Sequence, residues 1–156
     1  MKKQERSSES VTDVHTGKVL VTVKGAFHGD KCFPSLNDYL KEMGTHPQAG
    51  GKFKKKYENI ANTFIRRCLK RWKAQGQITL HYRFYEPEKG VKRDHMNVFT
   101  MFDKVFQDSL QACGVIQNDS PKYVDGNRIT HQFFYVSGEP KVEIEIEEVE
   151  TPESFS

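Results

Sequence analysis

Hydrophobic residues recur along the chain with two periods, and each period predicts a different kind of element. Alternation of apolar and polar residues predicts four strands, over residues 18–25, 77–86, 128–136 and 141–149. Apolar residues spaced three and four apart predict long helices over 52–73 and from Asp94 to a stop at Gly114. A shorter helix is expected over Ser35–Met43, with Ser35 as N-cap and Gly44 as stop.

The predicted order is β-α-α-β-α-β-β, which favours an α+β domain with a small mixed β-sheet flanked by helices. We expect a single domain over 17–150, between flexible tails at 1–16 and 151–156. A flexible loop is expected over 45–51, and a turn at 137–140 joins the last two strands.

The helix that begins at Asp94 combines an apolar face with a polar one. With Asp94 at 0° and about 100° per residue, one group of apolar residues falls in an arc from roughly 20° to 160°. This arc is expected to face the core and contains Val98, Phe99, Phe102, Val105, Phe106, Leu110 and Cys113. Beside it, from roughly 280° to 360°, lie Asp94, Asn97, Met101, Lys104 and Asp108. Asp103 falls near 180°, away from that cluster.

The polar face suggests hydrolytic chemistry on a phosphodiester. The loop after the helix presents Asp119, which could fold back toward the carboxylates and the lysine of the helix. Carboxylate oxygens are the ligands that Mg²⁺ prefers, and the ion activates water and neutralises charge at phosphorus. A structural interpretation stays open for each residue. Asp94 at a helix start is often only a cap, and Lys104 with Asp108 is often only a surface pair.

Composition and charge add a candidate partner. The chain has 36% hydrophobic and 29% charged residues, and its mean hydropathy is −0.72. Residues 1–75 hold 16 Lys or Arg against 7 Asp or Glu, whereas 139–156 hold one Lys against 7 Glu. A basic half of this kind favours nucleic acid as partner. Three cysteines without metal-ligand spacing, no signal peptide and no long apolar stretch predict a cytoplasmic protein without a membrane contact.

Three segments carry a more specific pattern: KRDHMN (92–97), DKVFQDSLQACGVIQND (103–119) and PKVEIEIEE (140–148). Together they resemble the RusA family of Holliday-junction resolvases, especially members from phages and prophages. The likeness extends over about 78–149, and PSLNDYL (34–40) is also similar to phage-type relatives. The resemblance implies a RusA-like homodimer in a bacterial or phage-infected cell. Such a dimer binds a four-way DNA junction and makes paired cuts with Mg²⁺, for which Mn²⁺ can substitute.

The resemblance also implies roles for individual residues. Asp94 matches the first motif aspartate, Lys104 the helix lysine, Asp108 the aspartate before Ser-Leu, and Asp119 the last loop aspartate. These four residues are the expected catalytic set, and the three aspartates among them are the expected metal ligands. The expected DNA contacts are Lys54, Lys55, Lys56, Arg66, Arg67, Lys70, Lys92, Arg93 and the motif asparagine Asn97.

Two residues depart from the family pattern. Met96 stands where a second motif aspartate is expected, and Asn118 replaces the first aspartate of the loop pair. A thioether is no ligand for Mg²⁺, so the metal site must use fewer carboxylates, recruit Asp108 or be impaired. We expect recruitment, because Asp108 lies on the same face of the helix. Two alternatives therefore remain: a branched-DNA binding protein that has lost catalysis, and a basic protein-interaction domain with no role on DNA.

Overall fold

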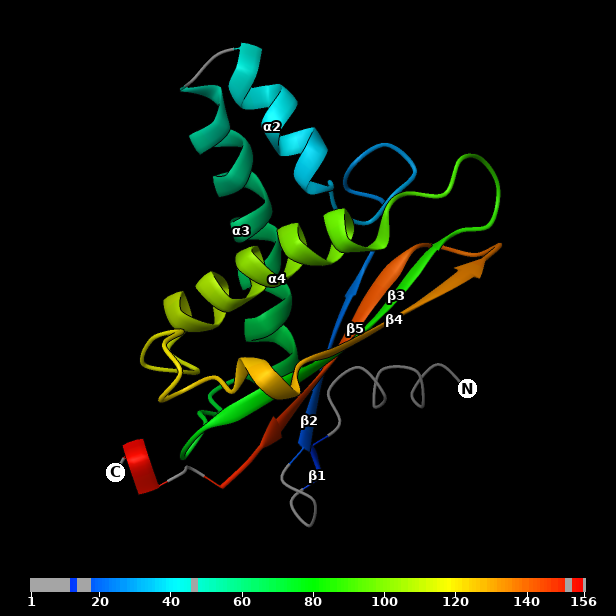
Figure 1. Cartoon of the computed structure of the whole chain (residues 1–156). Coiled ribbons are helices and arrows are strands. Elements are labelled where there is room, and N and C mark those ends of the chain that lie inside the picture. Colours follow the sequence, from blue (N-terminus) through cyan, green and yellow to red (C-terminus); the bar gives the residue numbers. More distant parts are fainter. Residues whose placement is uncertain (1–11, 14–17, 46–47, 151–152, 156) are drawn as a thin grey trace.

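The computed structural model describes residues 12–13, 18–45, 48–150 and 153–155. A β-sheet forms one layer, and helices α2, α3 and α4 gather on one of its faces (Figure 1). The α+β class and the mixed sheet predicted from the sequence are confirmed.

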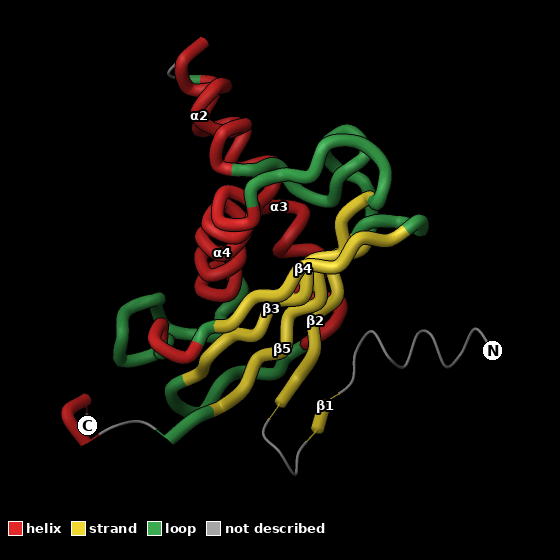
Figure 2. Tube along the Cα trace, turned by 45° about the vertical axis from the view of Figure 1, so that its right-hand side comes forward, coloured by secondary structure: helices red, strands yellow, loops and turns green. Residues whose placement is uncertain are grey.

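The sheet has five strands in the order β1-β2-β5-β3-β4. β2 (Lys18–Lys24), β5 (Lys141–Glu148) and β3 (Ile78–Pro87) pair in antiparallel fashion, and β4 (Thr130–Val136) runs parallel to β3. β1 (Thr12–Asp13) borders β2 and lies inside the predicted N-terminal tail, most of which lies outside the described residues. Figure 2 shows the strands side by side, with β4 at the edge opposite to β1.

The turn at 137–140 does not form a hairpin, because β3 lies between the two strands that it connects. β5 has neighbours on both edges, and its alternate residues Val142, Ile144 and Ile146 are buried under the helices. β4 is therefore an edge strand next to β3, and among the described strands none pairs with its other side.

α2 (Leu36–Thr45) begins with a capping box. Ser35 Oγ accepts a 3.3 Å hydrogen bond from the Asp38 amide, and the Ser35 amide donates one of 2.8 Å to the Asp38 carboxylate. The predicted N-cap is confirmed, whereas the helix runs one residue past its predicted stop at Gly44.

α3 (Ala49–Leu69) is shifted toward the N-terminus relative to the prediction. The expected loop at 45–51 is wrong in its last three residues, which form the first turn of the helix. The helix ends early because Lys70 takes a positive φ of 57° while its amide bonds to the Arg66 carbonyl. Trp72, expected on the apolar stripe, follows the helix and still packs against the core.

α4 (His95–Ala112) starts after Asp94 and is followed by Gly114 with φ 77°, as predicted. One assignment on its wheel is wrong, because Met101 is 4% exposed rather than on the polar face. α4 packs on the sheet through Phe102 and Phe106 and also contacts α2 and α3, so its buried arc is wider than a one-sided helix would have. Within the described ranges no helix is long and apolar enough to cross a membrane.

Candidate metal and nucleic-acid site

Asp94 acts as the N-cap of α4. Its Oδ1 accepts hydrogen bonds from the amides of Met96, at 2.9 Å, and Asn97, at 3.2 Å. This is the structural role that the sequence left open for it. The carboxylate remains exposed to solvent, but it lies nine residues before Asp103, about 13 Å along the helix axis.

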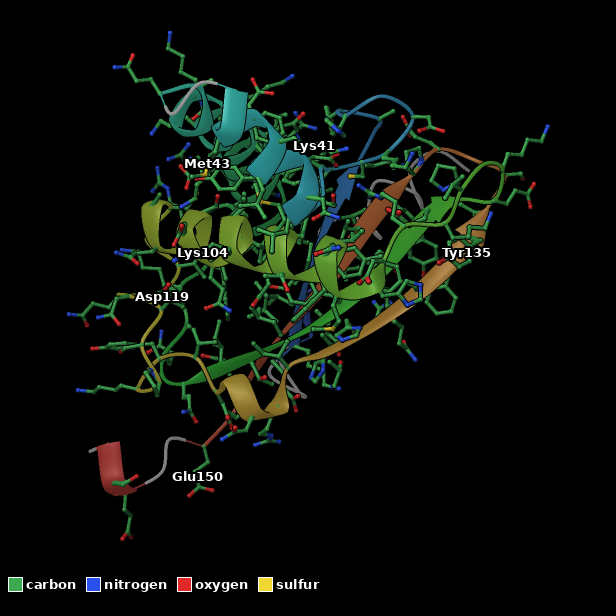
Figure 3. All side chains as sticks on the ribbon, turned by 45° about the horizontal axis from the view of Figure 1, so that its top comes forward. Lys41, Met43, Lys104, Asp119, Tyr135 and Glu150 are labelled. Carbon is green, nitrogen blue, oxygen red and sulfur yellow. The ribbon has the colours of Figure 1, made fainter. Side chains whose placement is uncertain are left out.

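The other predicted site residues form a chain of ion pairs. Lys104 Nζ lies 3.5 Å from Asp108 and 3.9 Å from Asp119, and its side chain is 59% exposed. Figure 3 shows Lys104 and Asp119 side by side on α4 and the loop that follows it. Asp108 also lies 3.1 Å from Lys54 of α3. Asp108 is thus neutralised from two sides, which disfavours its recruitment by a divalent cation.

Asp103 was set aside in the sequence analysis, yet it lies beside Asp119. Both residues line the same groove of 730 Å³, together with Gln107 of α4. Asp103 is half-buried, and its Oδ1 accepts hydrogen bonds of 2.5 Å from the Tyr82 hydroxyl and 2.9 Å from Gln107 Nε2. Tyr82 is fully enclosed on β3, so the sheet fixes the position of this carboxylate.

The electrostatics of Asp103 are those of a carboxyl group that ionises reluctantly. Burial raises the pKa of Asp103, and the charge of Asp119 raises it further. The hydrogen bonds from Tyr82 and Gln107 and the charge of Lys104 act in the opposite direction without cancelling the shift. A raised pKa beside a second carboxylate, in a groove, is typical of functional sites.

A third carboxylate, that of Asp125, also lines the groove. Its Oδ1 accepts a 3.0 Å hydrogen bond from the Asn127 amide. In the part of the chain that the structure describes, no three His, Cys, Asp or Glu side chains are close enough to hold a metal together. Asp103 and Asp119 supply the ligand type of an ion such as Mg²⁺, which keeps several waters and binds one or two carboxylates plus substrate phosphate. They do not fit an ion that needs a closed protein cage.

The sequence held a weak signal for Asp103 and Asp125. On the helical wheel Asp103 is the acidic residue at the border of the apolar arc, where a side chain can reach into the rim of the core. Asp125 opens a turn followed by Gly126. Neither position indicates on its own that α4 and the 119–129 segment line a common groove.

Most of the predicted DNA contacts lie on an exposed basic face of α3 and the residues after it. Lys55, Lys56, Arg66, Arg67 and Lys70 are exposed, and Glu58 is the single acidic residue of the helix. Arg67 and Lys56 lie over the rings of Phe64 and Tyr57. Lys54 differs from these residues: burial lowers its pKa, but the hydrogen bond and charge of Asp108 outweigh that effect and raise it.

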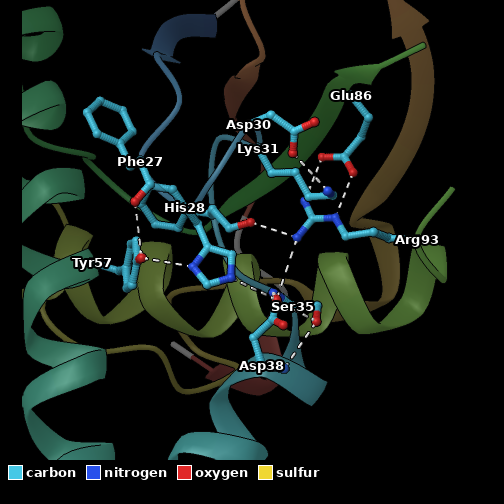
Figure 4. A network of polar contacts seen from close by, with 10 residues as sticks. Phe27, His28, Asp30, Lys31, Ser35, Asp38, Tyr57, Glu86 and Arg93 are labelled. Carbon is cyan, nitrogen blue, oxygen red and sulfur yellow. Dashed lines mark hydrogen bonds and ion pairs between the residues drawn. The ribbon is translucent and has the colours of Figure 1, made fainter. Parts of the chain in front are cut away.

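Arg93, another predicted DNA contact, has a role inside the protein. Its guanidinium forms a bidentate pair with Glu86, at 2.8 and 2.7 Å, and donates a 2.8 Å hydrogen bond to the Phe33 carbonyl. The side chain is 12% exposed, and Asp38 lies 3.9 Å away (Figure 4). Arg93 therefore ties the segment before α4 to β3 and to the loop before α2. Its guanidinium has little surface left for a phosphate.

The same network reaches α3 through histidine and tyrosine. His28 lies 3.3 Å from the Asp38 carboxylate and 3.2 Å from the Tyr57 hydroxyl, which donates to the Phe27 carbonyl (Figure 4). Burial lowers the pKa of His28, although the charge of Asp38 raises it. These contacts link the loop before α2 and the first turn of α2 to α3, so His28, Asp38 and Tyr57 have a structural role.

Comparisons with known proteins do not identify a family for this chain. The sequence matches no protein-family model, and a search of curated proteins finds no match for it. The geometry of the groove and the charge of α3 therefore carry the functional argument, together with the resemblance noted in the sequence.

Proposed function

We propose that the protein is a Mg²⁺-dependent endonuclease that cuts branched DNA, with a four-way junction as its substrate. The observation that carries the proposal is the placement of Asp119 and Asp103 in one groove, with Lys104 3.9 Å from Asp119. Two carboxylates and an exposed ammonium group at one groove supply what phosphodiester hydrolysis with a hard cation needs.

Each residue has a distinct task in this proposal. Asp119, on an exposed loop, and Asp103, held by Tyr82 and Gln107, would hold the ion between them. Bound Mg²⁺ would supply activation of water and neutralisation of charge on the phosphate. Lys104 would contact a nonbridging or leaving oxygen, because its side chain is largely exposed and tethered only at the surface.

The exposed lysines and arginines of α3 would bind the DNA backbone. Paired cuts in opposing strands need two active sites at a fixed separation, which a two-fold homodimer supplies. The resemblance places Asp94 in the metal site as well. In the single chain Asp94 lies at the start of α4, about 13 Å along the helix axis from Asp103. Its contribution to the metal site therefore stays a prediction.

A branched-DNA binding protein without catalysis is the second candidate. Two observations favour it: Asp108 is held between two lysines, and Met96, 54% exposed, stands where a carboxylate is expected. The basic face of α3 would then serve binding alone.

A synthetic four-way junction separates the two candidates. Purified protein should nick it at symmetric positions with Mg²⁺ or Mn²⁺ and leave it intact in EDTA. Salt-sensitive binding without cleavage at any metal or protein concentration would favour the binding protein. Junction affinity no better than that for an acidic polymer would refute both candidates.

A further inference from the structure

Three aromatic rings are stacked in a row from the core to the surface, at the β4 edge of the sheet. Phe84 of β3 is buried, and the Phe133 ring of β4 lies 4.6 Å from it at an interplanar angle of 13°. The His95 ring, at the start of α4, lies 3.8 Å from Phe133 at an angle of 1°. Because Phe84 already occupies one face of Phe133, His95 covers the opposite face. The stack therefore ends at the exposed ring of His95.

The orientation of the last ring is fixed. The Nε2 atom of His95 is 2.7 Å from the Tyr135 hydroxyl, a contact made at the edge of the imidazole ring. Tyr135 is exposed at 36% and is placed by β4, two residues after Phe133. With Phe133 on one face and Tyr135 at the edge, the outer face of His95 is a rigid, flat aromatic surface.

Charge beside this surface favours an anionic partner. Lys92 Nζ lies 5.0 Å from the centre of the Tyr135 ring and donates a hydrogen bond to the Glu88 carbonyl. The Asp94 carboxylate, next to His95 in the sequence, faces the first amides of α4 through its Oδ1. An exposed ring next to a lysine is the arrangement that proteins use to bind single-stranded nucleic acid.

We infer that the outer face of His95 stacks on one unpaired nucleobase, with Lys92 contacting the adjoining phosphate. The inference rests on the proposed function for the class of partner, nucleic acid, and names the feature recognised. A base within a duplex has both faces covered by its neighbours, so this site selects unpaired nucleotides, such as those at a branch point.

The position of the site relative to the groove supports this assignment. β4 runs from Tyr135 back to His131, about 13 Å for four residues. His131 lies 4.6 Å from the Phe99 ring, and both residues line the groove that holds Asp119. A strand whose base is stacked on His95 can therefore follow β4 toward the proposed metal site.

The test uses DNA that carries 2-aminopurine, in EDTA so that no cleavage occurs. We expect the protein to change the fluorescence of 2-aminopurine at an unpaired position and not within a duplex. His95→Ala should remove this change and weaken binding to the unpaired DNA by about tenfold, while His95→Phe, which keeps a ring, should retain both. Phe134→Ala is the matched control, because Phe134 is an exposed aromatic residue on the opposite face of β4, stacked on Tyr85.

An unchanged fluorescence response and affinity in the His95→Ala variant, with its thermal unfolding intact, would overturn the inference. Equal binding of unpaired and fully paired DNA by the unaltered protein would also overturn it, and would indicate that the protein contacts only the DNA backbone. Junction cleavage in Mg²⁺ is measured separately with the same variants. If stacking on His95 fails, cleavage by the groove can still be measured in Mg²⁺. If the protein does not cleave, stacking can still be measured in EDTA.

Discussion

The Tyr82 hydroxyl donates a 2.5 Å hydrogen bond to Oδ1 of Asp103, and so joins the centre of the sheet to the wall of the groove. Tyr82 is fully buried among Phe84, Phe102 and Phe106, which holds its hydroxyl in place. Burial and the neighbouring Asp103 together raise the pKa of Tyr82 well above its ordinary value, so the hydroxyl stays protonated and donates.

Tyr82→Phe removes this donor and keeps the ring. We expect a loss of about 1–2 kcal/mol in the free energy of unfolding, because a hydrogen bond to a carboxylate is lost in a dry environment. The pKa of Asp103 should rise further, since the hydrogen bond from Tyr82 acts to lower it. Urea unfolding at pH 7 measures the first effect and NMR titration of the carboxyl the second. A variant as stable as the original protein would show that the hydrogen bond contributes little.

Asp103→Asn should stabilise the protein at neutral pH, by about 1 kcal/mol. Burial raises the pKa of Asp103 in the folded state above its unfolded value, so the folded chain binds the proton more tightly. Stability from this group is therefore complete below the unfolded pKa and is lost as the pH rises through the folded pKa. The advantage of the asparagine variant should shrink in acid, below about pH 4. Denaturant unfolding at pH 7 and pH 3.5 checks the sign, and an advantage that grows in acid would contradict it.

Asp94→Ala should cost about 1 kcal/mol of stability, whereas Asp94→Asn should cost little, because asparagine caps a helix as well as aspartate does. Thermal unfolding of the two variants measures the difference. The asparagine variant then removes only the charge, and the family resemblance predicts that its cleavage is lost. Equal destabilisation by both substitutions would show that the carboxylate, rather than the cap, stabilises α4.

Lys55 and Lys54 are neighbours on α3 with different surroundings, and they form a matched pair for DNA binding. Lys55 is exposed, while Lys54 is 3.1 Å from Asp108. Lys55→Gln should weaken junction binding and reduce the slope of log affinity against log salt by about 0.9, the value for one phosphate contact. Lys54→Gln should leave the slope unchanged. An unchanged slope in the Lys55→Gln variant would contradict the assignment of Lys55 on the basic face of α3 as a DNA contact.

Local signals predicted the elements well, and long-range contacts account for what they missed. α4 begins and ends where the sequence predicts, because Asp94 caps its first turn and Gly114 takes a positive φ after its last. Asp103 was missed because its environment depends on Tyr82, 21 residues away on a strand whose position in the sheet is not a local property. Arg93 was assigned to DNA because its partner Glu86 lies on β3 and is not visible as a helix pair.

The placement of β4 follows the same rule. Its alternating residues identified it as a strand, but the order of the sheet places it parallel to β3 and separates it from β5. That non-local choice puts His131 and Phe133 beside α4, and His131 also lines the groove.

The most direct test of the proposed function is Mg²⁺-dependent cleavage of a four-way junction by three aspartate variants at equal junction occupancy. We expect Asp119→Asn and Asp103→Asn to lower the cleavage rate by at least about a hundredfold while junction binding is retained, since each would remove a metal ligand. Asp30→Asn, a change to an exposed loop residue paired with Lys31, serves as the control and should cleave normally. Normal cleavage by both Asp119→Asn and Asp103→Asn would contradict the proposal that this groove holds the catalytic metal.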